Sequence, residues 1–132
     1  MEHGAQGKCE VEDGKASFRF QDLEIWKLAC GLSNELFDLA DELEKKGFRR
    51  FAEQIRGAGL SMPNNIAEGS GSFSDLEFRH FLNVARRSTF ENASMVLVFD
   101  SRALVDPERK HRLLDGLSTL ARKITAFRKS LK

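Results

Sequence analysis

The chain has 132 residues, of which 41% are hydrophobic and 31% are charged, and its formal net charge at pH 7 is +1. This length and composition are typical of one globular domain with one core. The near-neutral charge excludes a strongly basic nucleic-acid-binding surface spread over the whole chain. No apolar run approaches the length of a membrane span, and the first residues lack the apolar stretch of a signal peptide. We therefore expect a cytoplasmic protein with no membrane partner.

The first residues differ in composition from the rest. Residues 1–17 are glycine-rich, charged and without hydrophobic periodicity, which predicts a disordered N-terminal tail before a domain over residues 18–132. The two cysteines, Cys9 and Cys30, have no spacing that suggests metal ligands. We expect free thiols in a reducing compartment.

Hydrophobic periodicity predicts four helices and no strand. The first three are expected over Asp22–Lys46, Phe48–Glu68 and Asp75–Ala103, and the fourth begins with Asp106 as its N-cap. Four long helices with short connections indicate an all-α, up-down-up-down four-helix bundle. Pro63 lies inside the second helix, where it removes one backbone hydrogen bond, so we expect a kink near it.

The corner between the second and third helices has strong capping signals. Gly69 is expected as the left-handed glycine that ends one helix, and Ser74 with Glu77 as the capping box that starts the next. Phe73, just before that cap, is expected to pack on Phe78.

Glu68 is unusual because its carboxylate lies near the negative end of the helix dipole. It therefore calls for a partner, either Arg79 or the free N–H groups of the next helix. A polar lock of the corner is the favoured interpretation, and a ligand site is the alternative.

This corner also carries a family motif. The string from Ser61 to Gly69, together with residues 22–27, 54–56 and 81–91, resembles the bacterial four-helix-bundle family of 23S ribosomal RNA intervening-sequence proteins over Phe20 to about Leu131. The resemblance marks seven positions as motif residues: Ser61, Pro63, Asn64, Asn65, Ile66, Glu68 and Gly69. Relatives are encoded within ribosomal RNA gene insertions, some form rings of five, and a distant relative is a nucleic-acid-binding accessory of reverse transcriptases. The resemblance thus implies a homopentamer and a contact with RNA or DNA.

Charge is distributed unevenly along the chain. Between Asp22 and Lys46 there are seven acidic and three basic residues, and from Asp106 to Lys132 there are eight basic and three acidic residues. Two interpretations stay open: internal matching between neighbouring first and fourth helices, and nucleic-acid binding. For the second, the candidate residues are Arg86, Arg87, Arg122 and Lys123.

The third helix has apolar residues on more than one side. Phe90 and Leu97, seven residues apart, lie beside its core stripe. Because an apolar surface outside the core favours burial against another molecule, we expect these two residues at a subunit interface of a homo-oligomer.

The best enzymatic candidate is a di-metal site, which uses Glu-x-x-His motifs on facing helices. Glu77 with His80 and Glu108 with His111 fit the motif. Both motifs occupy first turns of antiparallel helices, which places them roughly 40 Å apart. We therefore predict no enzyme, metal, cofactor or small-molecule substrate. Two functions remain: an assembling protein that contacts nucleic acid, and a protein-interaction scaffold that does not.

Overall fold

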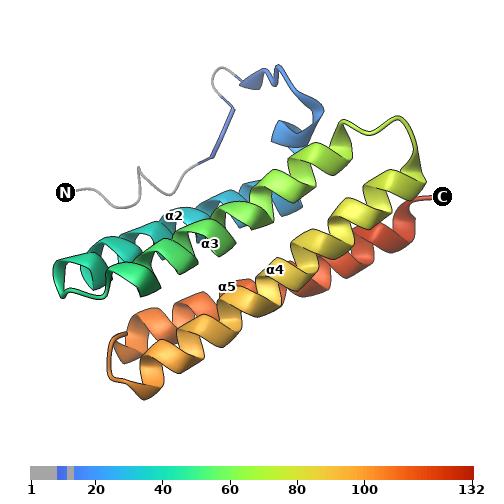
Figure 1. Ribbon diagram of the computed structural model, residues 1–132. Coiled ribbons are helices and arrows are strands. Elements are labelled where there is room, and N and C mark those ends of the chain that lie inside the picture. The colour runs from blue at the N-terminus through green and yellow to red at the C-terminus, as the bar shows by residue number, and fades with distance from the viewer. Residues whose placement is uncertain (1–8, 12–13) are drawn as a thin grey trace.

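The computed structural model describes residues 9–11 and 14–132. These contain a 3-10 turn, η2 (Arg19–Asp22), and four helices: α2 (Glu24–Lys45), α3 (Arg49–Ser70), α4 (Asp75–Ser101) and α5 (Pro107–Ser130). No strand occurs in this part of the chain. The α2–α3 hairpin lies against the α4–α5 hairpin with successive helices antiparallel (Figure 1). The predicted all-α four-helix bundle is confirmed. Most of the tail predicted over residues 1–17 lies outside the described residues.

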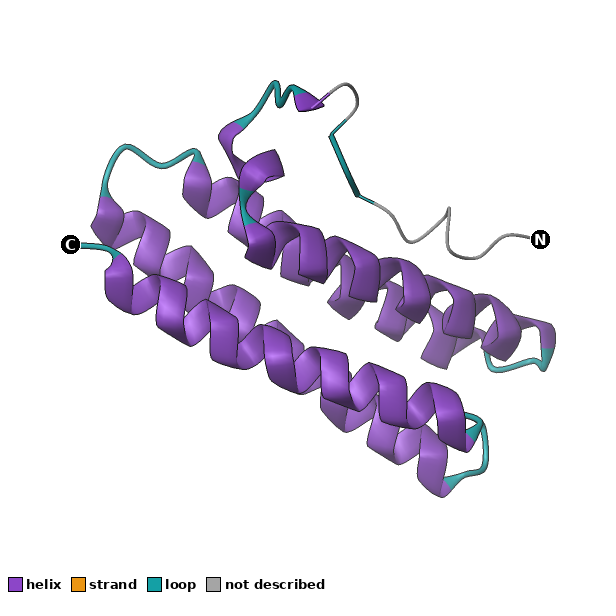
Figure 2. Ribbon diagram, turned by 180° about the vertical axis from the view of Figure 1, so that it is seen from behind, coloured by secondary structure: helices purple, strands orange, loops and turns teal. Residues whose placement is uncertain are grey.

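Connections between the helices are short and lie at the two ends of the bundle (Figure 2). Ser74 caps α4 by accepting a hydrogen bond from the Glu77 N–H at 3.2 Å, and Asp106 caps α5 by accepting one from the Arg109 N–H at 2.9 Å. The bond from Arg109 lowers the pKa of Asp106. This cap therefore stabilises α5 at neutral pH, and its contribution is lost as the pH falls through that lowered pKa.

Three local predictions were wrong. α2 begins at Glu24, because Asp22 ends the η2 turn and Leu23 is the N-cap. Gly69 does not end its helix: α3 continues to Ser70 and Gly71 follows as the C-cap with an ordinary φ of −87°. Phe73 does not pack on Phe78, since its side chain is fully exposed. A left-handed glycine does end α2: Gly47 follows that helix at φ +93°.

The core lies between the two hairpins and draws on all four helices. Leu36, Ile55, Leu82 and Leu117 are almost completely buried. Stacked phenylalanines extend this core at one end, where the rings of Phe51 and Phe99 are 5.1 Å apart. These contacts fix α3 against α4.

Complementary charges join α2 to α5. Arg109 pairs with Glu42 at 2.8 Å and Lys123 pairs with Glu24 at 3.1 Å. Arg112 pairs with Glu35, and that hydrogen bond raises the pKa of Arg112. The acidic first helix and the basic last helix therefore match each other internally, as one of the two interpretations of the charge asymmetry predicted. Each partly exposed pair contributes little, roughly 0–1 kcal/mol.

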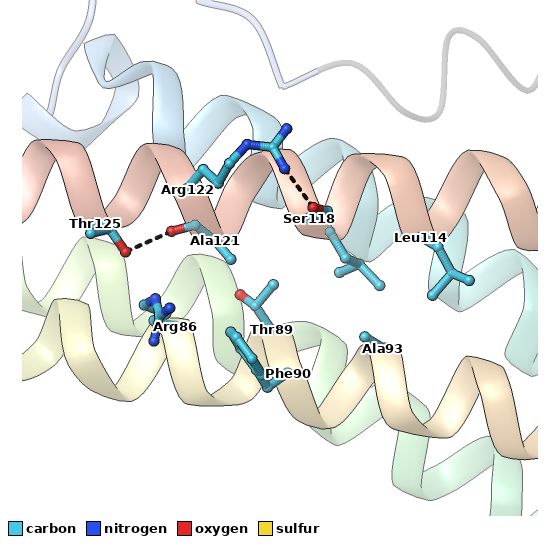
Figure 3. A pocket seen from close by; sticks show the side chains of 10 residues that line it. Arg86, Thr89, Phe90, Ala93, Leu114, Ser118, Ala121, Arg122 and Thr125 are labelled. Atoms are coloured by element: carbon cyan, nitrogen blue, oxygen red, sulfur yellow. Dashed lines mark hydrogen bonds between the residues drawn. The ribbon is translucent and has the colours of Figure 1, made fainter.

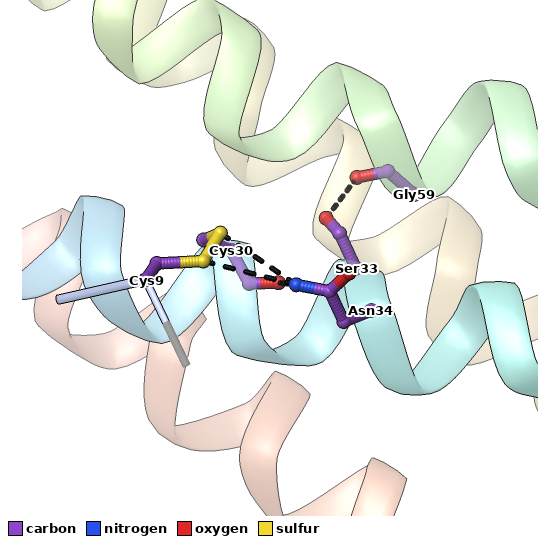
Figure 4. Close-up of a disulfide and its surroundings, with 5 residues drawn as sticks. All are labelled: Cys9, Cys30, Ser33, Asn34 and Gly59. Atoms are coloured by element: carbon purple, nitrogen blue, oxygen red, sulfur yellow. Dashed lines mark hydrogen bonds between the residues drawn. A yellow bond between two sulfur atoms is a disulfide. The ribbon is translucent and has the colours of Figure 1, made fainter. Parts of the chain in front are cut away.

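Cys9 and Cys30 form a disulfide, with their Cα atoms 6.1 Å apart (Figure 4). The prediction of free thiols was wrong, because the segment before η2 runs beside α2 and brings the two side chains together. The Asn34 amide lies beside both sulfurs, 3.7 Å from that of Cys9 and 3.8 Å from that of Cys30, and donates a hydrogen bond to the Cys30 carbonyl at 3.1 Å.

Reduction of this disulfide should release the N-terminal segment from α2 and leave the bundle folded. The core residues come from α2 to α5, so they do not depend on Cys9. We expect faster proteolysis between Cys9 and Phe18 after reduction, with little change in helical circular dichroism. The Cys9→Ser variant should behave like the reduced protein in oxidising buffer. Equal cleavage before and after reduction would show that other contacts hold the segment.

Candidate functional site

A groove of about 590 Å³ lies on the outer face of the bundle between α4 and α5 (Figure 3). Thr89, Ala93, Leu117 and Ala121 line its apolar floor. The hydroxyl of Thr89 is bonded to its own helix at the Ala85 carbonyl, 2.9 Å away. The floor therefore presents mainly carbon atoms to an occupant.

Two arginines and a phenylalanine surround this α4–α5 groove. Arg86 and Phe90 come from α4 and Arg122 comes from α5 (Figure 3). The Arg86 guanidinium stacks over the Phe90 ring, with its central carbon 4.8 Å from the ring centre. The Phe90 side chain is nevertheless 56% exposed. These three residues were candidates from the sequence, two for nucleic-acid binding and one for a subunit interface. The structure brings them together although they lie up to 36 positions apart in the chain.

The polar atoms of these arginines are unequally satisfied. Arg122 donates to the Ser118 hydroxyl at 2.6 Å and to that of Thr119 at 3.4 Å, both on its own helix. The Arg86 Nε is buried and has no hydrogen-bond partner among the described residues. Neither guanidinium has an ion-pair partner within residues 14–132 as the structure places them. The groove is therefore apolar with two uncompensated positive charges, and it suits an occupant that is both apolar and acidic.

The other predicted surface residues lie apart from the groove. Arg87 is exposed on α4, and Lys123 is engaged by Glu24 of α2. Leu97 is 49% exposed and lies next to Val98, which is 51% exposed. Phe90 and Leu97 are seven residues apart, which is close to two helical turns, so they lie along one solvent-facing side of α4. Val98 is exposed on a neighbouring side of the same helix.

The family motif on α3 contains a network of polar side chains at the α3–α4 contact. The hydroxyls of Ser61 and Ser88 share a hydrogen bond of 2.8 Å, and the Asn65 amide donates to the Ser61 hydroxyl at 2.9 Å. The buried Asn92 amide donates across the contact to the Ala58 carbonyl at 2.8 Å. The Ser61–Ser88 and Asn92–Ala58 bonds join α3 to α4, and Asn65 supports Ser61 from within α3, so this part of the motif has a structural role.

Pro63 explains one further buried hydrogen bond. A proline has no N–H, so the carbonyl four residues earlier, that of Gly59, loses its helical donor. The buried Ser33 hydroxyl of α2 donates to this Gly59 carbonyl at 2.5 Å. α3 continues through Pro63 from Arg49 to Ser70. A neighbouring helix thus supplies the donor that the proline lacks.

The remaining motif residues have separate environments. Ile66 is fully buried in the core and Asn64 is exposed. Gly69 is buried where α3 meets α4: a Cβ on it would lie 2.7 Å from the Phe78 ring and 2.8 Å from Phe81 Cβ. This close approach, and not a left-handed backbone, requires glycine.

Glu68 does not lock the corner. It is exposed, and Arg79, its expected partner, donates instead to the Lys132 carbonyl at 2.6 Å. No hydrogen bond or ion pair joins the Glu68 carboxylate to any residue that the structure describes, although its backbone carbonyl accepts a hydrogen bond from the Gly71 N–H at 3.1 Å. The Glu68→Gln variant should therefore change the free energy of unfolding by less than about 0.5 kcal/mol, as is usual for exposed sites. Urea unfolding followed by circular dichroism tests this. If the free energy of unfolding fell by about 1–3 kcal/mol, the interpretation of Glu68 as a polar lock of the corner would be correct after all.

The two Glu-x-x-His motifs lie far from each other. They occupy the first turns of α4 and α5, which are antiparallel and begin at opposite ends of the bundle. His80 and His111 are both exposed. Among the described residues, no three histidine, cysteine, aspartate or glutamate side chains cluster as a metal site would require. None of the described helices is long and apolar enough to cross a membrane.

Sequence reasoning found Arg86, Phe90 and Arg122 but not the groove between them. It also missed two exposed apolar side chains at the α3–α4 corner, Phe73 and Leu76. Their positions could have indicated this exposure, because both residues flank the N-cap Ser74 and the start of a helix usually faces solvent.

Comparison with known proteins gives one result that bears on this fold. A search of curated proteins finds no match. Residues 21–126 match the family described as 23S rRNA-intervening sequence protein, and this range contains α2, α3, α4 and most of α5. The matched range also includes the Ser61–Gly69 motif and the α4–α5 groove. The chain therefore belongs to the 23S rRNA-intervening sequence protein family.

Proposed function

We propose that this chain is a non-enzymatic, homo-oligomeric four-helix-bundle protein whose subunits associate through the outer side of α4. The observation that carries the proposal is Phe90, which is 56% exposed beside an apolar groove of about 590 Å³. Leu97, seven residues later, extends this apolar surface along α4. Adjacent exposed apolar side chains of this size are typical of interaction surfaces.

A ring of five subunits is the assembly that we propose, in line with the resemblance described above. Light scattering coupled to size exclusion should then give a mass of about five times the 14.9 kDa chain mass. A single chain mass at micromolar concentration would remove the proposal.

Phe90→Asp should dissociate this assembly at micromolar concentration. The substitution introduces a charge where the interface would exclude water, and loss of one central aromatic anchor typically costs about 2 kcal/mol or more of association free energy. Leu60→Asp is the matched control, because Leu60 is 47% exposed but lies on α3. Size exclusion with light scattering should separate the two variants. Dissociation by both would point to a general loss of solubility or folding instead.

Contact with nucleic acid is the second part of the proposal, and the family's connection with 23S rRNA favours RNA. This role implies a cytoplasmic location, where ribosomal RNA lies and where a disulfide such as Cys9–Cys30 is uncommon. Arg87 supports it because this side chain is exposed and has no ion pair within the described chain. Lys123, by contrast, is partly neutralised by Glu24. In an oligomer each exposed cation is repeated, so weak contacts add through effective concentration.

Arg87→Gln should weaken RNA binding and lower the slope of log K against log salt, since phosphate contacts release counterions. Fluorescence anisotropy with a labelled structured RNA and with duplex DNA measures both quantities. Lys123→Gln is the matched control and should have the smaller effect. If the wild-type protein binds neither nucleic acid at about 50 mM salt, the alternative function, a protein-interaction scaffold, replaces this part of the proposal.

A further inference from the structure

The corner between α3 and α4 exposes two large apolar side chains. Phe73 is 107% exposed and Leu76 is 70% exposed, so both side chains lie mostly in solvent. Glu68 and Glu77 are also exposed there, and neither forms an ion pair among the described residues. We call these four residues the apolar corner. It combines apolar side chains with unpaired carboxylates.

The apolar corner cannot reach the α4–α5 groove of its own subunit. Phe73 precedes Phe90 by 17 positions, which along a helix is roughly 25 Å. α4 is a continuous helix from Asp75 to Ser101, so no bend brings the two together. Contact between this corner and a groove requires a second molecule.

The two surfaces complement each other in chemistry. The α4–α5 groove has an apolar floor and two arginines, Arg86 and Arg122, without ion-pair partners in the described part of the chain. The apolar corner offers Phe73 and Leu76 to that floor and two carboxylates to those arginines. Burial of exposed apolar surface would drive this contact, and the opposite charges would orient it.

We propose that the apolar corner of one copy of this chain inserts into the α4–α5 groove of the next copy. This inference rests on the proposed homo-oligomer and specifies its interface. Each subunit then contributes two different surfaces, so the contact is head-to-tail. Repeated contacts of this kind close into a ring or extend as a filament, and they leave no two-fold axis between neighbours.

A mixing experiment separates this arrangement from others. A corner variant (Phe73→Ala with Leu76→Ala) and a groove variant (Ser118→Trp with Arg122→Glu) change exposed residues, so both should keep their helical circular dichroism. Each variant alone lacks one half of every contact and should be monomeric. Mixed in equal amounts, they retain one intact corner and one intact groove per pair. The mixture should therefore form a heterodimer of about twice the 14.9 kDa chain mass and nothing larger.

Leu60→Ala is the matched control for loss of exposed apolar surface, and it should leave the wild-type mass unchanged. The inference is overturned if the corner variant retains the full assembly, or if two monomeric variants fail to form a heterodimer when mixed. In either case, dissociation by Phe90→Asp would still support the homo-oligomer. A monomeric wild-type chain would overturn both the oligomer and this interface.

Discussion

Gly69→Ala should lower the free energy of unfolding by about 1–3 kcal/mol, the usual range for overpacking a well-packed core. The added Cβ would lie 2.7 Å from the Phe78 ring and 2.8 Å from Phe81 Cβ. Phe78 is almost completely buried and its ring also packs against Phe127, with ring centres 5.5 Å apart. The ring therefore cannot move aside without disturbing α5. Urea unfolding followed by circular dichroism measures the change.

Gly57→Ala is the matched control, because Gly57 lies on the same helix and a Cβ there would meet no atom within 4 Å. This substitution should stabilise the protein by about 0.5–1 kcal/mol, since alanine favours helix more than glycine does. We therefore expect alanine to change the free energy of unfolding in opposite directions at the two glycines. Stabilisation by Gly69→Ala would show that α3 and α4 are further apart than the structure places them.

Ser33→Ala should also destabilise the bundle, by about 1–3 kcal/mol, because it leaves the buried Gly59 carbonyl without a donor. The cost should be smaller in a Pro63→Ala background. Alanine at position 63 restores an N–H four residues after Gly59, so the carbonyl no longer depends on α2. A double-mutant cycle of these two substitutions measures the coupling directly.

We expect a coupling of roughly 0.5 kcal/mol or more, with the Ser33 hydroxyl contributing most when proline is present. Ser94→Ala is the matched control, because Ser94 is an exposed serine on α4 and its loss should change stability by less than about 0.5 kcal/mol. Equal costs of Ser33→Ala in both backgrounds would contradict the explanation given for the Ser33–Gly59 bond.

The candidate site was only partly predictable from the sequence. Phe90 could be assigned to a surface because it lies beside the core stripe of α4, and its exposure agrees. The sequence could not show that Lys123 is engaged in an ion pair while its neighbour Arg122 is not. Adjacent positions on a helix point in different directions, and only the position of α2 shows that Lys123 meets Glu24. The groove itself depends on two helices whose facing residues cannot be paired without their relative register.

By itself, the sequence determined the four helices, the Ser74 and Asp106 caps and the all-α fold, because periodicity and capping depend on residues a few positions apart. Only the tertiary structure decided the role of Gly69, the donor for Gly59 and the Cys9–Cys30 bond. Each of these depends on how closely two segments approach and at which register they pack. Distance and register are set by the packing of the whole core, where many side chains fit together at once.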